Sequence, residues 1–215
     1  MGNLFSVRQA CRHAGMEGVV TSAAREILTA DAVILPGVGA FGDAMEALNR
    51  LGLVPVLKEA AASRPFMGVC LGLQLMMEES YEFGRHKGLG LVPGVTRRLE
   101  PRADDSGRRP KVPQVGWNRI APPEGAEADR LWKGTPLEGI SPGEYMYFVH
   151  SYYPEPEDPG VVLTVTEYGG QRFCSGLRRG NLYAFQFHPE RSGPQGLRIY
   201  ANLARLIATT AEAVP

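Results

Sequence analysis

The stretch Pro65-Phe-Met-Gly-Val-Cys-Leu-Gly-Leu-Gln74 decides the fold. It opens with a continuous apolar run, which is typical of a strand buried in a parallel sheet. Gly68-Val-Cys-Leu-Gly72 then leads directly into residues with helical spacing. This is G-x-C-x-G at a strand-to-helix turn, the thiol counterpart of the G-x-S-x-G nucleophile elbow. Small flanking residues allow a sharp, strained turn that lifts the Cys70 sulfur above the sheet, and the helix N-terminus favours a thiolate.

Strands and helices alternate on both sides of this stretch. Asp31-Ala-Val-Ile-Leu-Pro36 reads as a second buried strand. Helical spacing predicts helices over 6–14, 40–51, 54–63, 71–80 and 194–208. This alternation predicts an α/β fold with a doubly wound, mainly parallel sheet flanked by helices.

The second half of the chain is richer in β-like segments. They cover residues 112–118, 145–151, 161–168, 171–177 and 182–187, several of them separated by turns with Gly or Asn. The segment 97–111 is rich in Arg, Asp, Pro and Gly and is expected to form an exposed excursion between strands. We therefore expect residues 1–215 to form one domain with an added antiparallel β portion.

Composition excludes several classes of function. The chain has 215 residues, 23 Lys+Arg and 23 Asp+Glu, and so lacks the positive charge of sequence-independent nucleic-acid binders. Its 3 cysteines show no C-x-x-C spacing, which argues against a disulfide framework or a zinc ribbon and favours a reducing cytoplasm. No apolar run approaches the ~18 residues of a membrane span. Neither a metal nor a cofactor is indicated.

A nucleophilic cysteine needs a base, and the base needs an orienting group. His188 lies in Gln186-Phe-His-Pro-Glu190, after an apolar strand, with a carboxylate two residues away that can hold one ring nitrogen. The other three histidines read as structural: His13 at the surface, His86 in a loop and His150 in the core.

Attack of a thiolate on an acyl carbon also needs donors for the developing oxyanion. The elbow geometry predicts one donor at the backbone N–H of Leu71, next to the nucleophile. Pro36-Gly-Val-Gly39, a glycine-bearing turn at the end of the neighbouring strand, is the candidate for the second; its alternative interpretation is a simple strand-terminal turn.

Together these motifs resemble those of the class I, triad-type glutamine amidotransferases, a family with a flavodoxin-like fold. Three further motifs are similar to those of the glutaminase subunits of imidazole glycerol phosphate synthases. They are Lys87-Gly-Leu-Gly-Leu-Val-Pro-Gly94, Pro113-Gln-Val-Gly-Trp-Asn118 and Tyr147-Phe-Val-His-Ser-Tyr-Tyr153. The resemblance covers nearly the whole chain.

The resemblance assigns roles to individual residues. It implies Cys70 as nucleophile, His188 as general base and then acid, and Glu190 as the orienting carboxylate. Gln74 would bind the amino-acid head of the substrate, and Gly37 to Gly39 would form the oxyanion strand. Ser151 and Tyr152 would line the glutamine pocket. Residues toward the subunit interface would be Gln114, Trp117 and Asn118. Arg191 departs from the lysine that is usual in the family, and a guanidinium differs from an ammonium in geometry.

The activity implied is hydrolysis of L-glutamine to L-glutamate and ammonia. Ammonia would pass to a separate cyclase partner, which makes imidazole glycerol phosphate and an aminoimidazole carboxamide ribotide in histidine biosynthesis. Three alternatives remain: a glutaminase serving another synthase, for anthranilate or pyridoxal phosphate; a silent scaffolding subunit; and a thiol hydrolase of the elbow-cysteine peptidase type.

Family members begin with an apolar strand and a turn of the Tyr-Gly-x-Gly-Asn-Leu type. Gly2-Asn3-Leu4 matches the end of that turn, so the resemblance implies a first strand that the printed sequence lacks. We expect the upstream genomic sequence to continue in frame with roughly ten mostly apolar residues.

Overall fold

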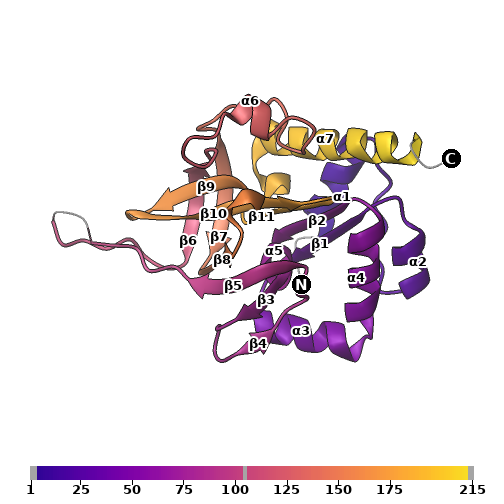
Figure 1. Cartoon of the computed structure of the whole chain (residues 1–215), viewed down its shortest axis with the longest axis horizontal. Helices are drawn as coiled ribbons and strands as arrows, with labels where there is room; N and C mark the ends of the chain where they lie inside the picture. The colour runs from indigo at the N-terminus through magenta and orange to yellow at the C-terminus, as the bar shows by residue number, and fades with distance from the viewer. Residues whose placement is uncertain (1–3, 104–105, 213–215) are drawn as a thin grey trace.

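The computed structural model describes residues 4–103 and 106–212, with the side chains of residues 210–212 left out. Its centre is a five-stranded sheet in the order β1-β2-β11-β10-β9 (Figure 1). These strands are β1 (Val33–Gly37), β2 (Phe66–Cys70), β9 (Val162–Tyr168), β10 (Gln171–Arg179) and β11 (Leu182–Phe185). The pairings β1–β2 and β2–β11 are parallel, while β11–β10 and β10–β9 are antiparallel. The expected parallel core therefore continues directly into the expected antiparallel portion.

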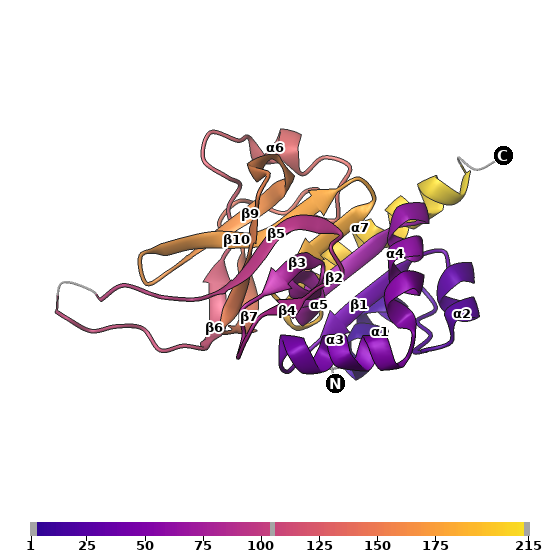
Figure 2. The same cartoon turned by 60° about the horizontal axis from the view of Figure 1, so that its bottom comes forward.

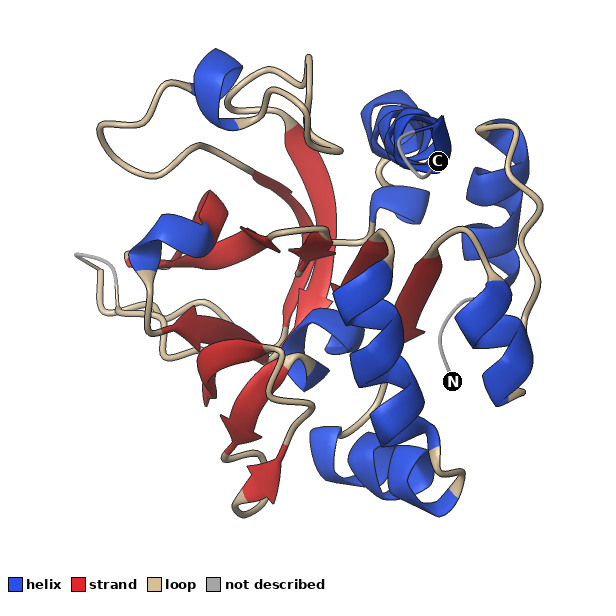
Figure 3. Ribbon diagram, turned by 45° about the vertical axis from the view of Figure 1, so that its right-hand side comes forward, coloured by secondary structure: helices blue, strands red, loops and turns tan. Residues whose placement is uncertain are grey.

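Helices cover both faces of this sheet (Figure 3). Successive residues of β11 alternate between two apolar clusters, as the period of two along a strand requires, and Phe66 and Met67 of β2 divide between the same two clusters. One cluster includes residues of α1 (Leu4–His13) and α7 (Gly193–Glu212). The other includes residues of α2 (Ala24–Thr29), α3 (Phe41–Arg50) and α4 (Leu53–Ser63). The result is a three-layer arrangement, which confirms the predicted α/β class.

The outer strand β1 pairs with β2 alone among the described residues. Its register places Gly37 opposite Cys70, so the turn after β1 lies beside the nucleophile elbow. Residues 18–21, apolar in sequence, form no strand, and Val19 and Val20 are exposed. Of the Gly2-Asn3-Leu4 turn that the resemblance implies, residues 2 and 3 lie outside the described residues.

A second β portion packs beside the central sheet. It contains a four-stranded sheet, β4-β3-β5-β8, and a two-stranded sheet, β6-β7. Their bounds are β3 (Met77–Ser80), β4 (His86–Lys87), β5 (Val92–Arg98), β6 (Gln114–Arg119), β7 (Tyr145–His150) and β8 (Tyr152–Pro156). The short elements α6 (Ala128–Leu131), η1 (Pro159–Val161) and η2 (Pro189–Arg191) complete the chain.

The helix predicted over residues 71–80 is wrong in its second half. Only α5 (Leu71–Leu75) is helical, and the chain then forms β3, which pairs with β5 and β4. Met76 to Ser80 contains good helix formers, but strand pairing with β5, in which Met77 lies opposite Val92 and Ser80 opposite Thr96, overrides that local preference.

The described residues between β5 and β6 form an extended arm that projects away from the body of the molecule (Figure 2). Figure 1 shows the same arm beyond the ends of β9 and β10. Arg102 N–H donates to the carbonyl of Gly169 (2.7 Å), which holds one side of the arm against the β9–β10 turn. The expected excursion over 97–111 is confirmed for the described residues, except that residues 97 and 98 belong to β5. Residues 104 and 105 of the expected excursion lie outside the described residues.

Candidate active site

Cys70 is the last residue of β2 and has the strained backbone that the elbow motif predicts. Its φ is 55° and its ψ is −112°, a combination that L residues rarely adopt. The flanking glycines make the turn possible. A Cβ on Gly72 would lie 1.7 Å from the carbonyl oxygen of Leu35, and a Cβ on Gly68 would lie 2.6 Å from Met76 Cε. The first of these contacts is with backbone, so no side chain fits at residue 72.

The other two cysteines are unsuited to nucleophilic chemistry. Burial raises the pKa of the Cys174 thiol to about 12 and also raises that of Cys11, so both remain protonated at neutral pH. Cys70 differs in its position at the turn, where its Sγ lies 3.8 Å from the carbonyl oxygen of Val149 and 3.8 Å from the side-chain amide of Gln186.

His188 and Glu190 form a buried pair at the start of η2. His188 Nδ1 lies 2.7 Å from Glu190 Oε1, and the two side chains are 5% and 2% exposed. This is the geometry by which a carboxylate fixes the tautomer of an imidazole. Nε2 is therefore the ring nitrogen available for proton transfer.

The environment of His188 stabilises its protonated form. Burial by itself would lower the pKa of the imidazole, but interactions with Cys70 and with Glu190 outweigh it and raise the pKa to about 10. At neutral pH His188 therefore carries the proton that a leaving amine will need.

This shift predicts how stability depends on pH. Because His188 binds its proton more tightly in the folded chain than in the unfolded one, its stabilisation is complete below about pH 6.5 and is lost as the pH rises towards about 10. Urea unfolding of the wild type and of His188→Gln should give a difference in unfolding free energy that shrinks over this interval. A difference that stays constant would contradict the assigned pairing.

A backbone hydrogen bond to Tyr147 and the side chain of Ser192 hold His188 in place. His188 N–H donates to the carbonyl of Tyr147 (2.9 Å), and Tyr147 N–H donates to Ser192 Oγ (3.0 Å). The hydroxyl of Ser192 in turn donates to the carbonyl of His188 (2.7 Å). The sequence analysis did not identify Ser192 as a site residue, although a hydroxyl side chain two residues after Glu190 could have indicated it.

The turn after β1 lies against the residue that follows the nucleophile. A Cβ on Gly37 would lie 3.0 Å from Leu71 Cβ, and Gly39 has a φ of +105° that favours glycine. At the end of this segment, Phe41 N–H donates to Glu82 Oε2 (2.6 Å), which anchors the start of α3. The structure thus brings the two candidate oxyanion donors, Leu71 N–H and the glycine turn, to the same place.

Gln74 is buried on α5 and links two distant parts of the chain. Its Nε2 donates to the carbonyl oxygen of Tyr152 (2.8 Å) and to Gln186 Oε1 (3.1 Å). Ser151 and Tyr152 are half-buried at the junction of β7 and β8. The residues implied for a glutamine pocket therefore lie together beside the elbow.

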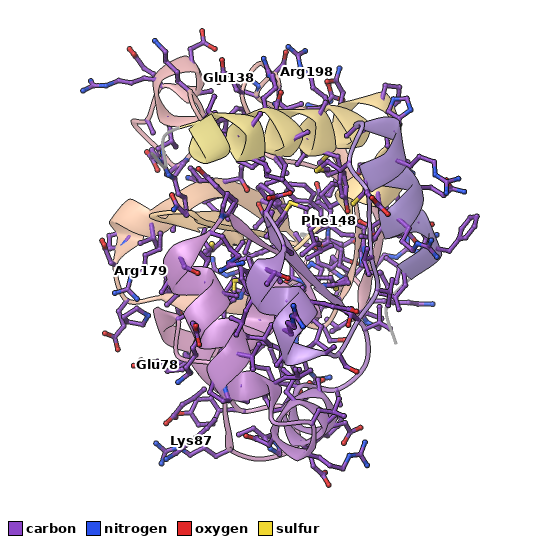
Figure 4. The ribbon with its side chains drawn as sticks, turned by 90° about the vertical axis from the view of Figure 1, so that its right-hand side faces the viewer. Glu78, Lys87, Glu138, Phe148, Arg179 and Arg198 are labelled. Carbon is purple, nitrogen blue, oxygen red and sulfur yellow. The ribbon has the colours of Figure 1, made fainter. Side chains whose placement is uncertain are left out.

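His150 is a core residue, as expected. Burial lowers its pKa to about 4, so the ring is neutral, and Nδ1–H donates to the same carbonyl of Tyr152 (2.8 Å). On β7 it alternates with outward residues and shares the inner face with Phe148, which is fully buried (Figure 4). His13 is at the surface, also as expected, whereas His86 is in the short strand β4 rather than in a loop.

The three residues implied for a subunit interface do not share one face. Gln114 is 2% exposed and lies opposite His150 in the β6–β7 pair, so its side chain points inward. Trp117 is 55% exposed on the opposite face of β6, and Val115 on that same face was missed. Asn118 lies on the same face of β6 as Gln114, and its side chain donates to the carbonyl of Glu167 (2.8 Å).

An aromatic cluster joins this outer face to the His188 turn. The Arg191 guanidinium carbon lies 4.4 Å from the centre of the Tyr147 ring, and Trp117 meets the same ring edge-on at 6.1 Å. A planar guanidinium suits this stacked position better than a compact ammonium does. The departure at Arg191 thus has a local structural reason.

Among the described residues, no group of three or more His, Cys, Asp or Glu side chains is placed to hold a metal ion. Over the same residues, no helix is both long and apolar enough to cross a membrane.

Comparison with known proteins gives consistent matches. The family model described as glutamine amidotransferase class-I matches residues 3–206. The chain is 45% identical over 205 residues to imidazole glycerol phosphate synthase subunit HisH of Rhodopirellula baltica, covering 95% of this chain and 93% of that protein. It is 44% identical over 207 residues to the Aquifex aeolicus subunit of the same name, covering 95% and 92%.

Solved structures support the fold. A glutamine amidotransferase superposes with a TM-score of 0.67 at 19% identity, covering 95% of each chain. A Thermoplasma acidophilum protein described as a putative GMP synthase subunit superposes with a TM-score of 0.63 at 17% identity, covering 96% of this chain and 89% of that one.

Proposed function

Since the chain belongs to the class I glutamine amidotransferases, and within them to the HisH subunits of imidazole glycerol phosphate synthase, we propose that Cys70, His188 and Glu190 release ammonia from glutamine. The family makes the chain a glutaminase subunit of histidine biosynthesis. The observation that carries the residue assignment is the strained backbone of Cys70 beside a buried His188–Glu190 pair. We propose that residues 1–215 form one glutaminase domain.

The proposed reaction starts with attack of Cys70 Sγ on the side-chain amide carbon of glutamine. The carbonyl oxygen becomes an oxyanion held by Leu71 N–H and by the turn at Gly37 to Gly39. The C–N bond then breaks, His188 gives its proton to the leaving nitrogen, and ammonia departs from a γ-glutamyl thioester.

Hydrolysis of the thioester completes the cycle. Water gives a proton to His188 Nε2 while its oxygen attacks the thioester carbon, the C–S bond breaks, and glutamate leaves. Glu190 stays ionised throughout and stabilises the imidazolium. Gln74 and the backbone at Ser151 and Tyr152 hold the amino-acid head of glutamine during both steps.

We propose that the ammonia passes to a separate cyclase subunit bound over the outer face of β6 and β7. This face carries three exposed apolar or aromatic side chains, Val115, Trp117 and Tyr145. The Trp117–Tyr147–Arg191 cluster connects it to the turn that carries His188. The partner would therefore sit close to the point at which ammonia is released.

Trp117 provides the test of this face. Replacing it by aspartate should weaken binding to the cyclase by about 30-fold or more, because a central aromatic anchor would be lost and a charge would face an apolar contact. The matched control is Leu51→Asp, which alters an equally exposed residue between α3 and α4, away from β6 and β7 (Figure 1). Equal affinities for the two variants, measured by titration calorimetry, would rule out this face.

The alternatives separate in simple experiments. Growth of a histidine auxotroph that lacks only its glutaminase subunit should be restored by this chain; failure would favour a glutaminase of another synthase. A silent scaffold would support the cyclase with ammonia but not with glutamine. A peptidase of the elbow-cysteine type would cleave substrates other than glutamine.

A further inference from the structure

Gln186 is a buried amide beside the nucleophile to which the mechanism above gives no role. It follows β11 directly, two residues before His188, and is 0% exposed. Its backbone N–H donates to the carbonyl of Ser175 (2.9 Å), so the residue is fixed to the end of the central sheet. A fully buried amide must have its polar atoms satisfied, and both atoms of this one reach groups of the site.

The neighbouring contacts determine which way the Gln186 amide faces. The carbonyl oxygen of Tyr152 can only accept hydrogen bonds, so the Gln74 atom 2.8 Å from it must be the donating Nε2. The same nitrogen lies 3.1 Å from the Gln186 side chain, which must therefore present its oxygen to Gln74. This leaves Gln186 Nε2 directed at Cys70 Sγ, at 3.8 Å, as the structure has it.

We propose that Gln186 is a further catalytic residue, which donates a hydrogen bond to the Cys70 sulfur while its oxygen fixes the glutamine-binding side chain of Gln74. This inference rests on the proposed function, since it assumes that Cys70 is the nucleophile. One amide group thus acts both on the nucleophilic sulfur and on the binding of the substrate.

The first effect concerns the sulfur. Its surroundings offer the Val149 carbonyl, which can only accept, and the His188 imidazolium, which is consumed as a proton source during the reaction. Gln186 supplies an N–H that stays in place throughout the cycle. A donor to a negatively charged sulfur in a buried site is stronger than a neutral hydrogen bond, so it stabilises the thiolate before attack and after departure of glutamate.

The second effect concerns the substrate. Gln74 Nε2 has two hydrogens, and Tyr152 and Gln186 accept both of them. The Gln74 oxygen is consequently the atom left to face the amino group of a bound amino acid. The neutral ring of His150 donates to the same Tyr152 carbonyl, which extends the hydrogen-bonded chain from β7 to the nucleophile.

The test compares Gln186→Met and Gln186→Glu with wild type, all assayed with the cyclase subunit present. Methionine keeps the length of the side chain but removes both polar functions. We expect kcat/KM for glutamine to fall by about 10- to 100-fold, and the rate of Cys70 alkylation by iodoacetamide, measured without glutamine, to fall as well. The alkylation rate separates an effect on sulfur from an effect on the substrate.

Glutamate at position 186 provides a signature that a purely structural amide would not give. When protonated, its carboxyl group can accept from Gln74 and donate to Cys70, as the amide does, but when ionised it places a second negative charge beside the sulfur. The activity of Gln186→Glu relative to wild type should therefore rise as the pH is lowered from about 8 to about 6. Cys70, His150 and His188 are present in both proteins, so the ratio to wild type reports the change that the new carboxyl group makes.

Asn202→Leu is the matched control. Asn202 is another buried amide, which donates to the carbonyls of Pro136 and Glu138 far from the site, so this variant should lose stability but keep the alkylation rate. A wild-type alkylation rate in Gln186→Met, or a pH-independent ratio for Gln186→Glu, overturns the inference. If instead wild type releases no ammonia, or Cys70→Ala still does, the proposed function itself is wrong.

Discussion

Replacing Cys70 by alanine is expected to lower the kcat of glutamine hydrolysis by about 10⁴-fold or more, because no covalent intermediate can form without the sulfur. The fold should persist, since the loss of one sulfur at the turn removes little buried surface and alanine tolerates the turn no worse than cysteine does. Glutamate release measured with the cyclase present reports the effect. Binding of the cyclase should be unchanged.

Cys174→Ala is the matched control for this experiment. Cys174 is also buried at the sheet, but it contacts the carbonyl of Gly176 rather than any site residue. Its replacement should leave kcat near that of wild type. Activity of Cys70→Ala within about tenfold of wild type would show that another group performs the attack.

The second large effect is expected for Glu190→Gln. An amide in this position keeps the size of the carboxylate but can donate to His188 Nδ1, which would place the ring proton on Nε2 and leave it unable to accept one. By analogy with the Asp-to-Asn substitution in serine-protease triads, kcat should fall by about 10²- to 10⁴-fold. The measurement is the steady-state rate over a range of pH.

Loss of the Glu190 charge should also lower the pKa of His188, to which the carboxylate contributes by a hydrogen bond and by its charge. The reaction needs protonated His188. The residual activity of Glu190→Gln should therefore decline at a lower pH than the activity of wild type does. The control is Glu138→Gln. Glu138 accepts a hydrogen bond from Gly134 N–H and lies at the outside of the molecule, where Figure 4 labels it. Similar rates for Glu138→Gln and Glu190→Gln would contradict the triad.

Much of the site could be predicted from sequence because its parts are local. The elbow needs a strand, a turn flanked by small residues and a helix within about ten residues, and all three are contiguous around Cys70. His188 and Glu190 are two residues apart, and their pairing follows from that spacing. The helix layers were predictable for the same reason, since helical periodicity is a local signal.

The features that sequence reasoning missed depend on distant pairings. β3 forms because residues 77–80 meet β5 and β4, and nothing within the segment itself indicates this. Gln114 points inward because the β6–β7 register places it opposite His150. The hydrogen bond between Gln186 and Gln74 joins residues 112 positions apart. Which atom of the Gln186 amide faces Gln74 can therefore be determined only from the folded chain.

In the proposed function, this chain supplies its cyclase partner with nitrogen that Cys70 takes from the glutamine side chain. The most direct test gives the complex glutamine labelled with ¹⁵N in its amide group, together with unlabelled ammonium and the ribonucleotide substrate. We expect ¹⁵N in the imidazole ring of the product with the wild-type complex, and none with Cys70→Ala. Unlabelled product from the wild-type complex, or labelled product from Cys70→Ala, would contradict it.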